Sequence, residues 1–318
     1  MARSLNPLFL AGLGAGFAAA AIATARALRS TPPPDGAVVL ITGGSRGLGY
    51  AIASRFAHRP VRLVLAARDR LELATAQQML LEEHPHLNPS DFYLVDANLA
   101  EPSECKRLVN ETLDRFGRID VLVNNAGIIE VGPAELQPLD AFDRAMDLHF
   151  YGPLHILWAA LPHLRRQEAM PGWSRRAAIV NIASLGGKVA VPHMLPYTAS
   201  KFALVGLSEG LHAELRKDNI LVTTVCPGLT RTGGEEHAQF IGNVDDERRW
   251  FNLSANAPLL SASVEYAADR IYSAVGQGCA ELTITPQAWL LSRVAGLCPN
   301  TTQCVAGLVN EHVLPAAP

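Results

Sequence analysis

The sequence predicts an α/β fold in which helices cover both faces of a doubly wound parallel sheet within a single domain. Short runs of apolar, β-branched residues recur between residues 37 and 225 and alternate with longer amphipathic stretches. Such runs are typical of strands buried on both faces, and a β-α-β alternation is typical of parallel sheets. Ligands of these sheets bind where the strands end. Residues that directly follow the apolar runs are therefore candidate site residues.

Length and composition narrow the classes of function. With 318 residues the chain is long enough to bury a full core. The formal net charge is −3 and there is no basic block, so we expect no nucleic-acid partner. The five cysteines are scattered, odd in number and without CxxC spacing. This usage indicates reduced thiols rather than a disulfide framework or a metal site.

Residues 1–31 are predicted to form a hydrophobic N-terminal segment. Residues 8–25 carry no charge, and Arg3, Arg26 and Arg29 flank them. As a helix they would span about 27 Å, just enough for the core of a bilayer. A membrane anchor, a cleaved signal peptide ending near Ala25, and an apolar helix that packs on the surface or in an oligomer all fit this pattern.

The first predicted strand, residues 37–41, leads into the glycine-rich stretch Thr42-Gly43-Gly44-Ser45-Arg46-Gly47-Leu48-Gly49 and then into a helical pattern. A strand, a glycine turn and a helix in this order form a cradle for phosphate, because the helix N-terminus supplies free amides and a positive dipole end. The spacing is GxxxGxG rather than GxGxxG. A glycine-rich turn without a ligand is the alternative, but the flanking strand and helix favour a binding loop.

The second predicted strand, residues 62–67, indicates which cofactor is bound. NAD enzymes place an acidic residue near the end of this strand to bind the ribose 2′-hydroxyl, whereas an arginine there accommodates a 2′-phosphate. This strand ends in Ala67-Arg68, and Arg46 lies in the glycine loop. Two guanidinium groups favour NADP(H) over NAD(H). The alternative is that both arginines are solvated loop charges.

The remaining elements continue the alternation. We expect helices over residues 71–83, 101–116, 142–166 and 197–217, and strands over residues 92–95, 119–123, 177–182 and 221–225. Polar residues follow several strands and would meet at one edge of the sheet: Ser45, Arg68, Asp96, Asn125 and Ser184.

Tyr197 and Lys201 are four residues apart, so one helix face would carry both. A phenol has a pKa near ~10, and a neighbouring ammonium favours its ionised form. Ser184, at the end of a strand, could hold a substrate carbonyl while Tyr197 exchanges the proton. The YxxxK spacing is common by chance, so its weight depends on the other motifs.

Together these motifs resemble the short-chain dehydrogenase/reductase family over residues 37–285. The glycine motif, Asn124-Asn125-Ala126-Gly127, Ser184, Tyr197 with Lys201, and Pro227-Gly228 with Thr232 all occur in the family's order and spacing. The resemblance implies a Rossmann-type domain that binds a nicotinamide cofactor and needs no metal. It implies that Tyr197 is the general acid/base, that Lys201 lowers its pKa and binds the nicotinamide ribose, and that Ser184 orients the substrate oxygen. The expected cofactor-binding residues are Gly43, Ser45, Arg46, Gly47, Leu48, Gly49, Arg68, Asp96, Ala97, Asn125, Ala126, Gly127, Tyr197, Lys201, Pro227, Gly228 and Thr232.

One position departs from the family pattern. Many members carry an asparagine in the helix before the serine strand, where it supports a water relay to the lysine. His149 stands at that place. An imidazole can also bind water, so His149 is a candidate catalytic residue. A packed helix histidine without a catalytic part is the alternative.

Two segments follow the nicotinamide-side motif. Residues 229–263 look irregular and include Phe240, Trp250, Phe251, Leu259 and Leu260, which indicates a lid over an apolar substrate. We therefore expect a dinucleotide-binding catalytic domain over residues 36–285 that includes this lid. Residues 286–318 read as a C-terminal helical tail, which could cover the site, pack in a dimer or rest on a membrane.

The leading hypothesis is an NADP(H)-dependent oxidoreductase that interconverts a small hydrophobic alcohol and its ketone or aldehyde. A cofactor-binding scaffold or redox sensor with little turnover is the alternative, and a soluble acyl-thioester ketoreductase fits the apolar N-terminal segment and the lid less well. We expect a homo-oligomer, a dimer or tetramer. Because NADP(H) is a cytosolic metabolite, we favour the membrane anchor, with the catalytic domain facing the cytoplasm.

Overall fold

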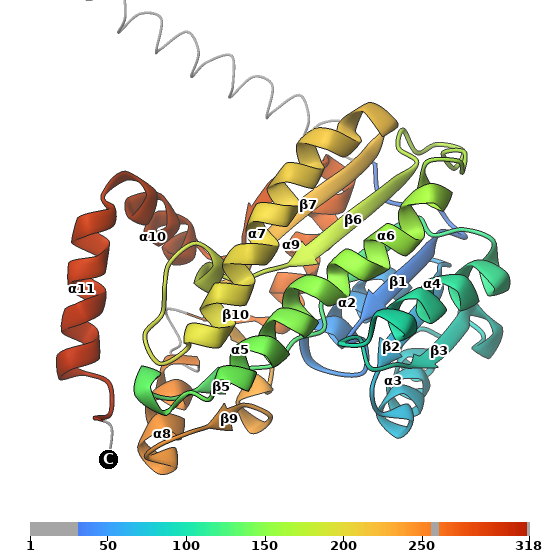
Figure 1. Cartoon of the computed structure of the whole chain (residues 1–318). Helices are drawn as coiled ribbons and strands as arrows, with labels where there is room; N and C mark the ends of the chain where they lie inside the picture. Colours follow the sequence, from blue (N-terminus) through green and yellow to red (C-terminus); the bar gives the residue numbers. More distant parts are fainter. Residues whose placement is uncertain (1–30, 256–260, 317–318) are drawn as a thin grey trace, which may run out of the picture.

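The structure, a computed structural model, describes residues 31–255 and 261–316, and its centre is a parallel sheet of seven strands (Figure 1). The strand order is β11-β7-β6-β4-β1-β2-β3. The strands are β1 (Val38–Thr42), β2 (Arg62–Ala67), β3 (Phe92–Asp96), β4 (Val121–Asn124), β6 (Ala177–Ile182), β7 (Ile220–Cys226) and β11 (Glu281–Thr283). The order reverses between β1 and β4, and ligands of open parallel sheets bind at such a switch point.

Helices cover both faces of the sheet, as the sequence predicts (Figure 1). One face carries α2 (Gly47–Ala57), α3 (Arg70–Glu83) and α9 (Val264–Gln277), and the other carries α4 (Pro102–Phe116), α6 (Gly152–Leu164) and α7 (Leu195–Leu215). Strand β1 shows why two cores form: Val39 and Ile41 point to the first face, and Val38 and Leu40 to the second. Side chains alternate along a strand, so an entirely apolar strand fills both cores.

The predicted helix over residues 142–166 is interrupted. It consists of α5 (Leu139–Met146), a π-helical turn (Asp147–Tyr151) and α6. In the turn the amide of Gly152 donates to the carbonyl of Asp147, five residues back. Pro153 has no amide hydrogen for the carbonyl of His149, so regular α-helical bonding cannot run through this point. The interruption sets the position of His149.

The predicted lid is less irregular than expected. Between residues 229 and 263 lie β8 (Thr230–Arg231), β9 (Gln239–Phe240), α8 (Val244–Ala255) and β10 (Ala262–Ser263). Strand β9 pairs with β5 (Glu130–Val131), and β10 pairs with β8. Three acidic residues in the first turn of α8 interact favourably with the positive end of its helix dipole, so part of the segment expected to be irregular is a helix. Leu259 and Leu260 lie outside the described residues.

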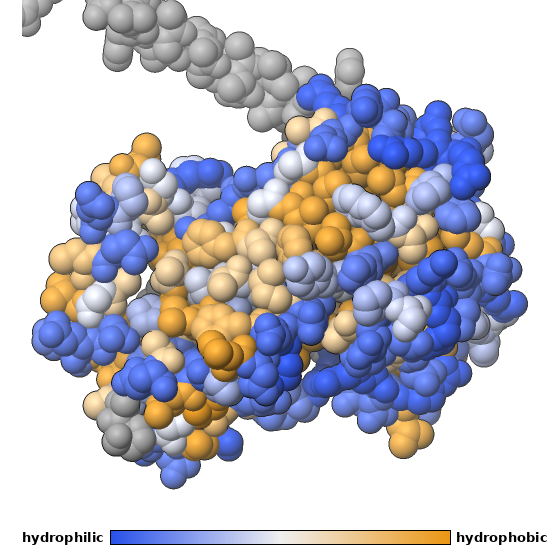
Figure 2. All heavy atoms as spheres, in the orientation of Figure 1, coloured by the Kyte–Doolittle hydropathy of each residue, from blue (hydrophilic) through white to orange (hydrophobic). Residues whose placement is uncertain are grey.

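The C-terminal tail is helical, as predicted, and contains α10 (Pro286–Leu297) and α11 (Pro299–His312). Ala288 in α10 is buried, whereas α11 has no buried residue and stands at the edge of the molecule (Figure 1). On the face shown in Figure 2, apolar side chains also gather over α6 and α7, where Trp158 and Phe202 are exposed.

The predicted N-terminal segment lies outside the described residues, apart from Thr31. Within residues 31–255 and 261–316, no helix is both long enough and apolar enough to cross a bilayer.

Candidate active site

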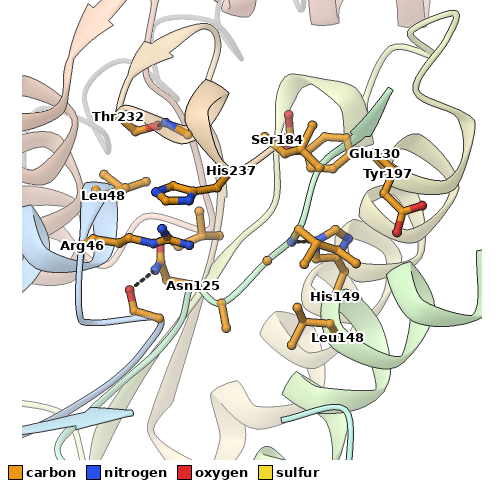
Figure 3. A pocket seen from close by; sticks show the side chains of 18 of the residues that line it. Arg46, Leu48, Asn125, Glu130, Leu148, His149, Ser184, Tyr197, Thr232 and His237 are labelled. Atoms are coloured by element: carbon orange, nitrogen blue, oxygen red, sulfur yellow. Dashed lines mark hydrogen bonds between the residues drawn. The ribbon is translucent and has the colours of Figure 1, made fainter. Parts of the chain in front are cut away.

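A cavity of about 1450 Å³ opens at the carboxyl edge of the sheet. This exceeds the ~300–1,000 Å³ of a typical small-ligand pocket, so it has room for a dinucleotide and a substrate together. Figure 3 shows two walls: Arg46, Leu48, Thr232 and His237 lie on one side, and Ser184, Tyr197, His149 and Leu148 lie on the other.

Most of the predicted site residues line this cavity. They are Gly43, Ser45, Arg46, Gly47, Leu48, Arg68, Ala97, Asn125, Ala126, Gly127, His149, Ser184, Tyr197, Lys201, Pro227, Gly228 and Thr232. Gly49 and Asp96, which are also predicted to bind the cofactor, do not line it. Gly49 is a packing residue, since a Cβ there would lie 1.9 Å from the carbonyl oxygen of Gly43. Asp96 is exposed and lies 3.6 Å from Nη1 of Arg70.

Asn125 holds the glycine loop in place. Its side-chain amide donates to the carbonyl oxygens of Thr42 (3.0 Å) and Gly43 (3.1 Å), and its backbone amide donates to Oγ1 of Thr42 (2.9 Å). Gly43 has a φ of +64°, and a Cβ there would lie 2.9 Å from Nδ2 of Asn125. The end of β4 therefore fixes the loop that follows β1, and the close approach requires glycine.

The N-terminus of α2 fits a pyrophosphate. Arg46 is its N-cap residue, and none of the described side chains caps this end. Gly47 and Leu48, the first two residues of α2, line the cavity. Uncapped first-turn amides and the positive end of the helix dipole both favour an anion. This fits the dinucleotide that the glycine motif predicts.

Beside this loop lies a cluster of charged residues. The hydroxyl of Ser45 donates to the carboxylate of Glu72 (3.0 Å), and Nε of Arg46 lies 3.8 Å from the same carboxylate. Asp69 accepts from the amides of residues 71 and 72 as the N-cap of α3. Both bonds use Oδ1, and Asp69 also lines the cavity. Glu72 was not predicted, because only the packing of α3 brings its side chain to the glycine loop.

Ser184, Tyr197 and Lys201 converge from β6 and α7. Ser184 follows β6, and its Oγ accepts from the amide of Gly186 (3.0 Å). Tyr197 lies in the first turn of α7 and Lys201 one turn later. The ammonium of Lys201 donates to the carbonyl of Ile182 (2.8 Å) and lies 5.6 Å from the centre of the Tyr197 ring.

Burial is the main influence on the pKa values of Tyr197 and Lys201. It raises the pKa of Tyr197, and a hydrogen bond with Ser184 offsets part of that rise. Burial lowers the pKa of Lys201 to about 8. Lys201 is itself desolvated and bonded to a backbone carbonyl, and the net effect of the surroundings on the pKa of the phenol is a rise. At neutral pH the phenol keeps its proton.

His149 is buried in the π-helical turn, and both of its ring nitrogens are bonded. Nε2 accepts from the amide of Ile128 (3.0 Å), and Nδ1 lies 2.8 Å from Oγ of Ser200, which donates to the carbonyl of Tyr197 (2.9 Å). Because Nε2 accepts, the proton is assigned to Nδ1. Burial and the charge of Lys201 hold the pKa of His149 well below its ordinary value. The ring therefore links the Asn-Asn-Ala-Gly loop to α7 as a neutral group.

Apolar side chains line part of the cavity, which is also lined by Glu236, His237 and Gln239. Trp250 and Phe251 line it from α8, and Val191 and Met194 line it from the loop before α7. Phe240, which we also expected here, does not line it. Val191 and Met194 were missed, although their place between Ser184 and Tyr197 was a signal that this loop borders the site.

Comparisons with known proteins agree with this geometry. The sequence profile of the family described as short chain dehydrogenase matches residues 37–239. The chain is 34% identical over 258 residues to 11-beta-hydroxysteroid dehydrogenase A of Sesamum indicum, which covers 80% of this chain and 69% of that protein. It is 36% identical over 198 residues to dehydrogenase/reductase SDR family protein 7-like of Anopheles gambiae, but the match covers 62% of this chain and only 60% of the relative. A crystal structure of a short-chain dehydrogenase from Streptomyces avermitilis superposes with a TM-score of 0.71 and 26% identity over 87% of this chain and 98% of that one.

Proposed function

The chain belongs to the short-chain dehydrogenase/reductase family, and we propose that it interconverts a hydrophobic alcohol and its ketone or aldehyde with NADP(H). The family makes it an NAD(P)-dependent oxidoreductase that acts on CH–OH groups. The observation that carries the finer proposal is the convergence of Ser184, Tyr197 and Lys201 on a cavity whose other wall is the uncapped N-terminus of α2.

In the proposed reaction, residues of the chain hold the substrate oxygen and transfer the proton. Ser184 orients the carbonyl oxygen of the substrate, and Tyr197 gives this oxygen its phenolic proton during reduction. The bound nicotinamide supplies the hydride for the carbonyl carbon. The ammonium of Lys201 stabilises the phenolate that remains on Tyr197. In the oxidation of an alcohol, the Tyr197 phenolate takes the hydroxyl proton back.

The preference for NADP(H) rests on the charges beside the glycine loop. Arg46 and Arg68 both line the cavity, and Ala67 ends β2 where a carboxylate would bind a ribose hydroxyl. Asp69, which also lines the cavity, uses its Oδ1 to cap α3. Glu72 opposes the preference, because its carboxylate holds Ser45 and Arg46. An incoming 2′-phosphate must displace it.

Two further proposals concern partners. The apolar side chains that line part of the cavity favour a hydrophobic substrate, and the exposed Trp158 and Phe202 favour a homo-oligomer. The uncharged residues 8–25 favour membrane association with the catalytic domain facing the cytoplasm.

Oxidation of NADPH with a panel of ketones tests the proposed reaction. Replacing Tyr197 by Phe should leave NADPH binding intact and lower kcat by about 10² or more, because the proton donor is lost. The control is Tyr266→Phe, which removes a hydroxyl from an exposed position on α9. If the wild type binds NADPH but reduces none of the ketones, the scaffold alternative replaces the enzyme.

A further inference from the structure

His193 and Glu247 form a buried pair of ionisable side chains that the proposed chemistry does not use. Their side chains are 6% and 0% exposed, and Nδ1 of His193 lies 2.8 Å from Oε1 of Glu247. A buried carboxylate is costly unless its oxygens are bonded. The pair therefore exists because each residue satisfies the other, and losing one partner would leave the other uncompensated.

Trp250 completes the group. Its indole Nε1 donates to Oε2 of Glu247 (2.6 Å), so both oxygens of the carboxylate have a donor. The rings of His193 and Trp250 meet edge to face, with centroids 6.4 Å apart. Glu247 and Trp250 are three residues apart in α8, so the carboxylate fixes the indole on the helix face turned toward His193. That indole is part of the cavity wall.

The backbone at His193 connects three parts of the site. Its φ is +62°, a left-handed conformation that is uncommon for a residue other than glycine. Its carbonyl accepts from the amide of Gly132 in the loop after β5 (2.8 Å). The next residue, Met194, lines the cavity and is the N-cap of α7, the helix that carries Tyr197. His193 thus joins the lid helix, the β5 loop and the start of α7.

We propose that His193 and Glu247 latch α8 to the start of α7 and thereby position Trp250 and Phe251 as the wall of the substrate half of the cavity. The pair is a positioning and specificity-determining element that acts through those side chains. Only the predicted effect of the pair on substrate kinetics rests on the proposed function. Its structural part, that the pair holds the lid helix, stands apart from the reaction.

The first experiment measures the latch without any substrate. Hydrogen–deuterium exchange of the α8 amides is compared in wild type, His193→Asn and Glu247→Ala, with Asp245→Ala as the control. Asn tolerates the left-handed backbone, so His193→Asn removes the imidazole without adding strain. Asp245 is an exposed acid on the same helix. Exchange over residues 244–255 should quicken in both latch variants while the central sheet keeps its protection. Unchanged exchange in α8 overturns the latch, whatever the enzyme's activity.

The second experiment measures specificity. Values of kcat/KM are determined with NADPH for one short ketone and one bulky cyclic ketone that the wild type reduces. The ratio between the two ketones should change by roughly tenfold in each latch variant, mostly through KM, and Glu247→Gln should restore part of it. The dissociation constant of NADPH should stay within twofold. A parallel loss for both ketones overturns the specificity role and leaves only a structural one. If the wild type reduces no ketone, the proposed function fails and the exchange experiment alone decides the latch.

Discussion

At the scale of single residues, burial sets the protonation of Tyr197 and Lys201 in opposite directions. It raises the pKa of the phenol and lowers that of the ammonium to about 8. Near neutral pH the phenol therefore holds its proton, as the reduction of a carbonyl requires, and Lys201 is close to losing its own. The low dielectric that raises the cost of both charges also strengthens their attraction once the phenolate forms.

Glu72 gives the first prediction. Its carboxylate occupies Ser45 and Arg46, which we assign to the 2′-phosphate of NADP(H). Glu72→Gln should tighten NADPH binding by roughly tenfold, because a repulsive charge leaves the phosphate site, and should change NADH binding little. Arg68→Asp should shift the preference toward NADH. Fluorescence titration of both cofactors measures this, with Glu82→Gln on the exposed face of α3 as the control. Unchanged selectivity in both variants would remove the phosphate-site assignment.

His149 gives a prediction about acid stability. Its pKa is well below the ordinary 6.5 in the folded protein, so between these two values the unfolded chain binds a proton that the native state does not. Stability then rises with pH through this window and is lost on acidification, by at most about 1.4 kcal/mol per pH unit for one group. His149→Asn has no imidazole at this position, so its stability should lack this pH dependence.

Urea unfolding at pH 7.5 and 5.5 measures the effect. The wild type should lose more free energy of unfolding between these pH values than His149→Asn does. His163→Asn, at an exposed position of α6, should behave like the wild type. Parallel losses in all three proteins would contradict a buried neutral imidazole.

The residues at the strand ends could be predicted because parallel strands share one carboxyl edge, so chain order alone brings Ser45, Asn125 and Ser184 together. The roles of Glu72 and His193 could not be predicted from chain order. Each reaches its partner through the packing of a helix whose tilt no local pattern encodes. Asp96 ends a strand as expected but does not line the cavity; its exposed carboxylate lies 3.6 Å from Nη1 of Arg70, which does.

At the scale of elements, the residue composition of each segment explains whether its strand or helix could be predicted. Apolar runs such as β1 and β4 were visible because they fill two cores at once. Strand β11 was missed because Glu281–Thr283 is too short to show a period. Helix α8 was missed because its first turn is charged. Its order depends on the burial of Glu247, which is a tertiary event.

The tail gives the prediction at this scale. No residue of α11 is buried, whereas Ala288 in α10 is buried and a Cβ at Gly228 would lie 3.0 Å from its methyl group. Removing residues 299–318 should therefore shift Tm by no more than about 2 °C, because little apolar surface is lost from the core. Removing residues 286–318 should lower Tm by more than that, since it uncovers Gly228. Differential scanning calorimetry compares the two variants. A large loss on the shorter deletion would mean that α11 is packed against another chain.

At the scale of the whole molecule, the described residues after the first thirty form the sheet, the two cores and the cavity. Among the residues that the structure describes, the seven-stranded sheet, both cores and the lining of the cavity fall between residues 37 and 288. Thr31 donates its amide to the carbonyl of Gly276 in the last turn of α9, and its own carbonyl accepts from Nε1 of Trp173 in the segment before β6. Residues 8–25 lie outside the described residues, and we propose from their apolar, uncharged sequence that they anchor the protein to a membrane.

Membrane fractionation of the full chain and of a variant lacking residues 1–31 tests the proposed role. The full chain should sediment with membranes, resist extraction by high salt and dissolve in detergent, because the apolar run rather than surface charge holds it. The shorter variant should remain in the supernatant with unchanged kcat and NADPH affinity, since its cavity is intact. Replacing Ala18 and Ala20 by Asp in the full chain is the matched control, because charges in the centre of the run disfavour insertion without shortening the chain. If all three proteins distribute equally, residues 8–25 do not anchor the enzyme, and the exposed apolar surface of α10 and α11 becomes the remaining candidate for any membrane contact.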